Sequence, residues 1–251
     1  MSGFYTLLHK ELSRFFKVGL QSIFAPMMAT LIYLLIFSHM LEDRIQAYPG
    51  ITYTTFLIPG LIMMAMLQNS FANSSSSLIQ SKISGSIVFV LLSPLSYMEI
   101  FVAYVLASII RGFLVGIGIY LVILIFFDIS LQSLLWVFVF ALIGNGFLGA
   151  LGIIAAIWAE KFDQLAAFQN FVILPLTFLS GVFYTIHSLP PFWENVSRFN
   201  PFFYVIDGFR YGFFGVSDIS PYFSLMIVVI SFLAVSLITL HMLRVGYKLR
   251  Q

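Results

Sequence analysis

The sequence has no cysteine and very little charge, and each shortage excludes a class of protein. Without cysteine, the chain forms no disulfide, holds no metal through thiolates and performs no thiol chemistry. Charged residues make up 9% of the 251 residues, whereas hydrophobic residues make up 61%. Soluble domains carry roughly a quarter charged residues. We therefore expect most of this chain to be surrounded by lipid.

Motifs for nucleotide and metal chemistry are missing as well. The sequence contains no GxxxxGK[ST] phosphate loop and no HExxH zinc motif, so we expect no metal site and no cofactor bound by this chain. Asp207, Gly208 and Arg210 resemble the start of a lipid-headgroup transferase motif, but the further aspartates that such metal chemistry needs do not follow. An intramembrane enzyme stays as an alternative with little support.

Six stretches are long and apolar enough to cross a bilayer. A hydrocarbon core about 30 Å thick requires about 20 helical residues. The expected spans are residues 20–41, 54–74, 98–127, 131–158, 165–187 and 221–243. The third span joins apolar residues on both sides of Arg111. The expected fold class is an all-α integral membrane protein, with residues 1–251 forming a single transmembrane domain.

The distribution of lysine and arginine predicts the orientation, because cytoplasmic loops retain these residues in excess. With the N-terminus inside, the outer segments hold only Arg44, Arg198 and Arg210. The inner segments hold Lys10, Arg14, Lys17, Lys82, Lys161, Arg244, Lys248 and Arg250. Both termini are therefore expected in the cytoplasm. The net charge of +2 reflects these inner loops, and we expect no nucleic-acid partner.

Two inner segments are too short or too polar to span. Residues 4–17 place apolar side chains on one helical face and cationic ones on the other, which is typical of an interfacial helix in contact with membrane lipid. A basic leader that only sets topology is the alternative. Residues 82–96 contain Gly85 and Pro94, and a short helix between them either presents a face to another protein or is a plain connector.

The segment 188–215 is crowded with aromatic residues, yet prolines and charges interrupt it. Its signals predict two short helices with a corner between them: prolines in each first turn, Asn200 as a cap, and Glu194 spaced i,i+4 from Arg198. A re-entrant hairpin in the outer leaflet would keep its aromatics at the interface. The candidate lid residues are Pro190, Pro191, Trp193, Glu194, Arg198, Asn200, Pro201, Asp207 and Arg210.

Polar residues inside the expected spans are candidates for a substrate pathway, because they are costly in lipid unless paired or wet. They are Gln68, Asn69, Asn73, Arg111, Asn145, Gln169, Asn170 and Thr177. Arg111 lies near mid-depth, where a charge costs at least about 3 kcal/mol unless compensated. It is either a structural arginine paired with a carboxylate or carbonyl, or a cavity residue that meets an anionic group.

Three stretches resemble the ABC-2-type permeases, the membrane subunits of ATP-driven exporters. The stretch GVFYTIHSLPPFWENVSRFNPFFYVIDGFRYGFFG, residues 181–215, looks like the C-terminal signature of that family. FLIPGLIMM, residues 56–64, resembles the start of its second span, and GSIVFVLLSPLS, residues 85–96, resembles its coupling segment. The sequence departs from the family at Val88, where many members carry an acidic residue.

The resemblance implies a homodimer of six-helix subunits in the inner membrane, bound to two copies of a cytoplasmic ATPase that carries ATP and Mg. The implied function is export of a hydrophobic, amphipathic or lipid- or glycan-type substrate by alternating access. A passive channel is the other alternative. The residues expected to couple the permease to the ATPase are Lys82, Gly85, Ile87, Phe89, Leu91 and Pro94.

Overall fold

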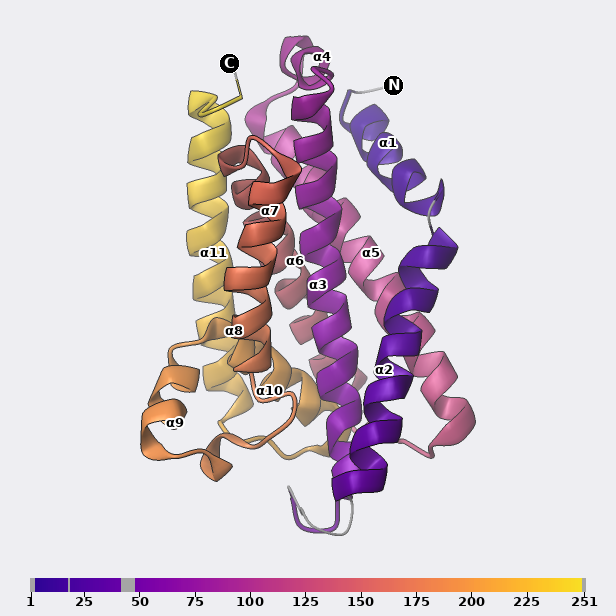
Figure 1. Cartoon of the computed structure of the whole chain (residues 1–251). Helices are drawn as coiled ribbons and strands as arrows, with labels where there is room; N and C mark the ends of the chain where they lie inside the picture. The colour runs from indigo at the N-terminus through magenta and orange to yellow at the C-terminus, as the bar shows by residue number, and fades with distance from the viewer. Residues whose placement is uncertain (1–2, 18, 42–47, 250–251) are drawn as a thin grey trace.

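The computed structural model describes residues 3–17, 19–41 and 48–249, and the long elements in these ranges are all helices (Figure 1). Five of them are long and apolar enough to cross a membrane. They are α2 (Gly19–Leu41), α3 (Tyr53–Ile83), α5 (Tyr97–Phe126), α6 (Leu134–Trp158) and α11 (Pro221–Val245). The predicted all-helical membrane fold class is confirmed.

Helix α3 forms the centre of the bundle. It packs along α5 and α6 and also contacts α2 and α10. In the most apolar 18-residue stretch of α3, 78% of the residues are buried inside the bundle. In the corresponding stretch of α2, 11% are buried. Helix α2 therefore leaves most of its surface for lipid or for another chain.

Four of the shorter helices lie towards the two ends of the bundle. They are α1 (Gly3–Lys17), α4 (Ile87–Leu92), α9 (Pro191–Arg198) and α10 (Pro201–Phe214). Figure 1 places α1, α4 and both chain ends at one end, which we call the terminal end, and α9 and α10 at the other, the hairpin end. The helix predicted over residues 4–17 and the two short helices predicted within 188–215 are confirmed.

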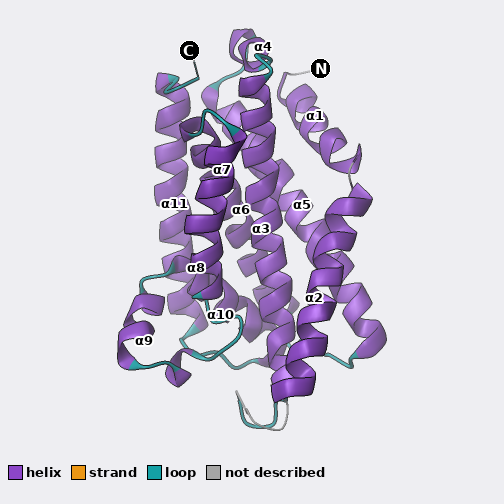
Figure 2. Cartoon of the chain, viewed as in Figure 1, coloured by secondary structure: helices purple, strands orange, loops and turns teal. Residues whose placement is uncertain are grey.

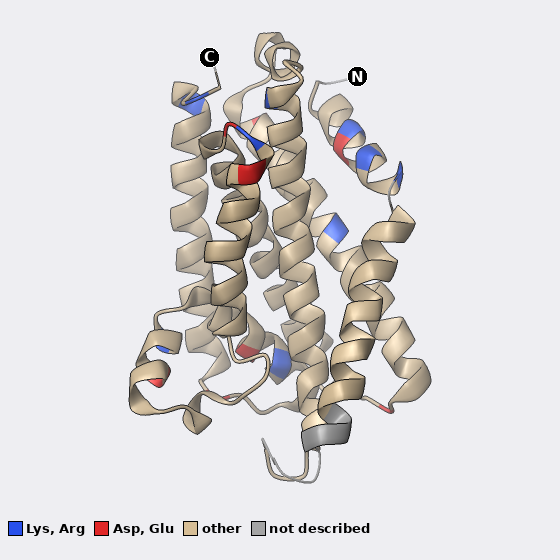
Figure 3. Cartoon of the chain, viewed as in Figure 1, with Lys and Arg blue, Asp and Glu red and all other residues tan. Residues whose placement is uncertain are grey.

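Loops and charges are concentrated at these two ends as well. The helical ribbon covers the middle of the bundle, and the loops connect helices mainly at its ends (Figure 2). Charged residues gather towards the same ends and are sparse between them (Figure 3). This arrangement is the one that lipid requires, because a backbone group in hydrocarbon must be bonded within its own helix.

The expected fifth span, 165–187, is not a single helix. The chain there forms α7 (Phe162–Phe168), a π-helical turn η1 (Gln169–Ile173) and α8 (Leu174–Phe178), and a 3₁₀ turn η2 (Ile186–Ser188) follows. The helical residues are continuous from Phe162 to Phe178, and Pro175 explains the π turn, because a regular α-helix would bring its ring against the carbonyl four residues earlier. The backbone widens before it, and the N–H of Leu174 donates to the carbonyl of Gln169, five residues back.

The second span is longer than expected, since α3 continues nine residues beyond the predicted end at Ser74. The predicted span stops where the polar run begins, but the hydroxyl of Ser74 finds a partner inside the bundle. The hydroxyl of Ser74 donates to the carbonyl of Gly149 on α6 at 2.7 Å. A serine hydroxyl that is bonded to another helix does not compete for the backbone hydrogen bonds of its own helix. The helix therefore continues to Ile83.

Candidate functional site

A buried polar network joins the three central helices. The hydroxyl of Ser70 on α3 lies 2.7 Å from Asn145 Oδ1 on α6 and 2.9 Å from the carbonyl of Ser108 on α5. The amide of Asn73 donates to Ser108 Oγ at 3.5 Å, and Ser108 in turn donates to the carbonyl of Tyr104 at 2.9 Å. All five residues are buried. The structure therefore brings two of the expected pathway residues, Asn73 and Asn145, into one network.

Close packing of α5 against α3 makes this network possible. At Gly112 an added Cβ would overlap Asn145 Oδ1 and Ser70 Oγ. At Gly152 on α6 it would overlap Ser74 Oγ. Glycine at these two positions lets polar groups from neighbouring helices reach one another across the crossing.

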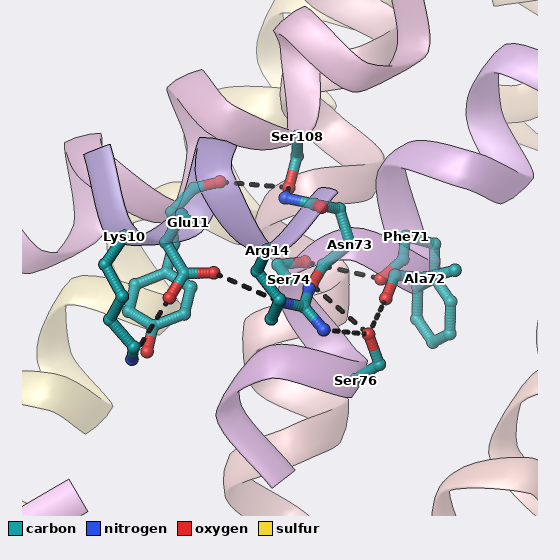
Figure 4. A network of polar contacts seen from close by, with 10 residues as sticks. Lys10, Glu11, Arg14, Phe71, Ala72, Asn73, Ser74, Ser76 and Ser108 are labelled. Atoms are coloured by element: carbon teal, nitrogen blue, oxygen red, sulfur yellow. Dashed lines mark hydrogen bonds and ion pairs between the residues drawn. The ribbon is translucent and has the colours of Figure 1, made fainter. Parts of the chain in front are cut away.

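Helix α1 is connected to the network from the terminal end (Figure 4). Arg14 donates to the carbonyl of Asn73 at 2.7 Å through Nη2 and to Ser76 Oγ at 3.1 Å through Nη1. Beside it the carboxylate of Glu11 is fully buried, 3.3 Å from Lys10 Nζ and 3.8 Å from Arg14 Nε. Helix α1 is therefore attached to the central helix α3 through the charged side chain of Arg14.

Sequence reasoning missed the role of Glu11, although a signal was present. The buried residues of α1 are Leu7, Glu11 and Phe15, spaced four apart. This spacing puts the glutamate on the apolar face of the helix. A carboxylate on that face predicts cationic partners for it, and Lys10 and Arg14 on the same helix supply them.

Arg111 lies on α5 beside the network and binds an amide. Its Nη2 donates to Asn69 Oδ1 at 3.0 Å, and Asn69 is held by its own bond to the carbonyl of Ala65 at 3.0 Å. Its guanidinium also lies 5.5 Å from the ring centroid of Phe15 on α1. Within the described residues Arg111 forms no ion pair, and its buried Nε has no hydrogen-bond partner. The arginine thus retains positive charge that an anionic group could use.

The other expected pathway residues lie apart from this network. Thr177 on α8 is buried and donates to the carbonyl of Ile173 at the end of η1 at 2.7 Å. Gln68 is partly exposed on α3. Gln169 and Asn170 are exposed on the π turn η1, on a face that the chain itself does not cover.

The terminal end presents an apolar surface on α4. Gly85 turns the chain with a φ of 72°, and α4 then exposes Val88, Phe89 and Leu92, with Phe89 77% accessible. Pro94 is exposed, Leu91 is partly buried, and Ile87 is buried. An apolar contact through Ile87 is therefore not available to a partner, whereas Val88 and Leu92 are.

Lys82 has a structural task at this end. Its ammonium donates to the carbonyls of Ala156, Ile157 and Ala159 at 3.1, 2.8 and 2.6 Å. These carbonyls belong to the end of α6, where the last helical groups lack partners within the helix. The lysine therefore fastens the end of α3 to the end of α6 rather than pointing to a partner.

A surface ion pair fastens α11 to the same end. Lys248 Nζ lies 2.9 Å from Glu160 Oε1. This hydrogen bond lowers the pKa of the Glu160 carboxyl and raises the pKa of Lys248. The chain segment after α11 is thereby held against the loop that follows α6.

Polar side chains and prolines of the hairpin end stabilise the short helices α9 and α10. Arg198 and Glu194 form the expected pair at 2.7 Å on α9. Asn200 caps α10 by accepting from the N–H of Phe202 at 3.0 Å, and its amide donates to the carbonyl of Leu176 at 2.6 Å. Pro190, Pro191 and Pro201 occupy helix starts, and Trp193 is 46% accessible.

Asp207 and Arg210 on α10 make separate contacts, although their spacing suggests a pair. Asp207 accepts from the backbone N–H groups of Asp218 and Ile219 at 2.8 and 3.1 Å. Burial raises the pKa of Asp207 to about 6, although these N–H donors favour its charged form. Arg210 donates to the carbonyl of Gly181 at 2.7 Å, and its guanidinium stacks 3.9 Å from the centroid of Phe56.

Asp218 completes this arrangement and was not expected from the sequence. Its carboxylate accepts from the hydroxyl of Tyr48 at 2.8 Å and from the N–H of Ile186 at 2.7 Å. It thereby ties the loop before α11 to the start of α3 and to η2.

Within the described residues no group of three or more metal-binding side chains occurs.

Comparison with known proteins places this architecture in a class. Residues 2–214 match the ABC-2 type transporter family, and the chain belongs to that family. It is therefore a transport permease of the inner membrane, and membership implies an ABC ATPase as partner.

Individual relatives cover different shares of the chain. Inner membrane transport permease YadH of Escherichia coli (strain K12) is 35% identical over 96% of this chain and 94% of its own length. Nodulation protein J of Rhizobium meliloti (strain 1021) is 26% identical over 77% of this chain and 74% of its own. Capsule polysaccharide export inner-membrane protein BexB of Haemophilus influenzae is 33% identical over 38% of this chain and 36% of its own.

Proposed function

We propose that this chain is the membrane-spanning subunit of an ATP-driven exporter. It moves a hydrophobic, amphipathic or lipid- or glycan-type substrate outward from the cytoplasmic side. The observation that carries the proposal is the attachment of α1 to the polar network through Arg14, 2.7 Å from the carbonyl of Asn73. A surface helix fixed to the middle of α3 is a means by which motion at the terminal end reaches the interior.

The proposed topology has six crossings and cytoplasmic termini. Helix α6 ends at the terminal end of the bundle and α11 begins at the hairpin end (Figure 1). The chain between them must therefore cross the bundle, and the broken segment α7, η1 and α8 runs along this path. We propose this segment as the fifth crossing and residues 188–215 as a re-entrant lid, all within a single domain over residues 1–251.

The proposed assembly is a homodimer. The exposed amides of Gln169 and Asn170 lie next to Phe171, which is 82% accessible. Uncovered amides are costly in hydrocarbon, and a second copy or a wet cavity between copies would satisfy them. The wide exposed surface of α2 offers further area for the same contact.

The proposed ATPase contact is the apolar surface of α4. Phe89 and Leu92 are 77% and 78% accessible there, and a groove on each of two ATPase subunits would cover them. ATP and Mg would be bound by those subunits. Arg111 then has the charge to contact an anionic group of the cargo.

The test is copurification followed by transport in vesicles. Coexpression with the ATPase should give a complex whose ATP hydrolysis is stimulated by the permease, and Phe89→Ser should abolish both. Phe199→Ser is the matched control, because Phe199 is 90% accessible at the opposite end. A flux through vesicles that proceeds equally without ATP would indicate a passive channel and overturn the proposal.

A further inference from the structure

An apolar cavity is present in the bundle, and no residue of the polar network lines it. It has a volume of about 330 Å³ and lies between α3, α5, α6 and α10. Its lining includes Ile62, Met66, Phe113, Ile117, Phe138 and Phe213. No charged or amide side chain borders it among the described residues. A volume of this size is that of a ligand site, because pockets for small molecules begin at about 300 Å³.

The rim of the cavity shows that its opening faces lipid. Ile117 on α5 and Leu134 and Phe138 on α6 are 51%, 69% and 51% accessible, although all three belong to candidate membrane spans. A hydrocarbon chain from the bilayer reaches the cavity without crossing any polar barrier.

A second, polar hollow adjoins this cavity at the hairpin end. Its volume is about 270 Å³, and Phe213 borders both spaces. The side chains of Thr52, Thr55, Asp128 and Gln132 line it, and no lysine or arginine does so among the described residues. An apolar space and a hydroxylated, acidic space therefore meet at one residue.

The backbone holds the two spaces in this relation. The loop between α5 and α6 is bonded to the end of α10, with Gln132 N–H donating to the carbonyl of Phe213 at 3.3 Å and Ser133 N–H to that of Gly212 at 2.9 Å. Asp128 and Gln132 thus stay beside Phe213.

We infer that these two spaces form a binding site for one phospholipid with an amine-bearing headgroup. An acyl chain fills the apolar cavity, and the headgroup lies in the hollow with its ammonium towards Asp128. The charge determines the class of headgroup: a carboxylate attracts an ammonium and repels an anionic lipid. Phosphatidylethanolamine has this chemistry, with an ammonium that donates hydrogen bonds, whereas phosphatidylglycerol lacks the cation.

The test uses the full-length protein in nanodiscs of equal phosphatidylethanolamine and phosphatidylglycerol, with bound lipid counted by native mass spectrometry. The protein should retain phosphatidylethanolamine about tenfold over phosphatidylglycerol, the size expected for one charge-assisted hydrogen bond. Ile117→Trp should fill the cavity and remove the bound lipid. Leu121→Trp is the matched control, one turn along the exposed face of α5 and outside the cavity lining, and should keep it.

Asp128→Asn separates the two halves of the inference, because it should keep one bound lipid but lose the headgroup preference. Equal retention of both lipids by the unaltered protein would overturn the headgroup assignment. The site itself would be overturned if the Ile117→Trp protein bound as much lipid as the unaltered protein. It would also be overturned if the Leu121→Trp protein lost as much lipid as the Ile117→Trp protein. A second copy of the chain in the cavity would also overturn the site. In that case the unaltered protein would carry no bound lipid, and Ile117→Trp would convert its dimers to monomers.

Discussion

At the scale of single residues, the charges of this protein have different tasks. Arg210 and Asp207 fasten loops at the hairpin end, and Lys82 fastens the end of α6. Arg111 is different, because it bonds a side-chain amide, that of Asn69, and both residues lie within candidate membrane spans rather than at a loop or a helix end. A cation of this kind within a membrane span is a functional candidate.

We predict that Arg111→Ala lowers transport by about tenfold or more while changing stability by only about 1–2 kcal/mol, the usual cost of one unpaired polar partner. The measurements are ATP-driven uptake into vesicles and thermal unfolding in detergent. Arg111→Lys keeps the charge and should retain part of the activity. Normal transport by a well-expressed Arg111→Ala protein would mean that the arginine is structural.

A second prediction concerns Glu11 and Arg14. Arg14→Met removes one of the two cations beside the buried Glu11 carboxylate, leaves the half-exposed Lys10 next to it, and should destabilise the protein by about 3 kcal/mol. Adding Glu11→Gln should recover part of that loss, because the poorly compensated buried charge is then gone. The measurement is a double-mutant cycle in chemical unfolding.

Lys10→Met is the control for this cycle, since Lys10 is half exposed and should contribute less than about 1 kcal/mol. Strictly additive single effects of Arg14→Met and Glu11→Gln would show that the two residues do not interact.

At the scale of elements, the helices are well predicted where composition alone decides, and poorly predicted where a neighbour decides. The amphipathic pattern of α1 and the proline starts of α9 and α10 are local signals, and each predicts its helix. The extension of α3 beyond Ser74 depends on acceptors from α6, and no local pattern contains that information. The π turn before Pro175 is a local effect that the hydropathy of 165–187 conceals.

The crossing of α5 with α3 and α6 yields the third prediction. Gly112→Ala should destabilise the bundle by about 1–3 kcal/mol, because the new methyl group forces Ser70 and Asn145 apart. Gly19→Ala on α2 is the matched control, since no atom lies within 4 Å of its added Cβ. Thermal unfolding of both variants decides the point, and equal melting temperatures would contradict the role given to Gly112.

At the scale of the whole molecule, the exposed surface raises the question of what covers it. A single copy leaves polar groups on η1 and large apolar side chains on α2 and α4 uncovered. Lipid suits the apolar faces of α2, but not the amides of Gln169 and Asn170. The absence of cysteine makes this question accessible, because any introduced cysteine is the only thiol in the chain.

The fourth prediction is that Phe171→Cys forms disulfide-linked dimers in native membranes under mild oxidation. Leu237→Cys on α11, also exposed at 67%, should stay monomeric because it faces lipid. Non-reducing gels give the result directly. Dimers from Leu237→Cys and none from Phe171→Cys would place the interface on another face.

The fifth prediction concerns orientation. A membrane-impermeant thiol reagent added outside cells should label Phe199→Cys at the hairpin end and leave Phe89→Cys on α4 unlabelled until the membrane is opened. The reverse pattern would invert the topology, and with it the side from which the substrate is taken.

The sequence by itself determined that this is a helical membrane protein of the ABC-2 type and where most of its spans and short helices lie. The helices depend on composition, periodicity and local capping, whereas the family assignment depends on the resemblance over residues 56–64, 85–96 and 181–215. Only the tertiary structure decided that Arg14, beside the buried Glu11, reaches Asn73, that Asp207 and Arg210 hold different loops, and that Lys82 caps α6. The physical reason is that a buried polar group takes whichever partner packing brings within about 3 Å, and that partner is often far away in sequence.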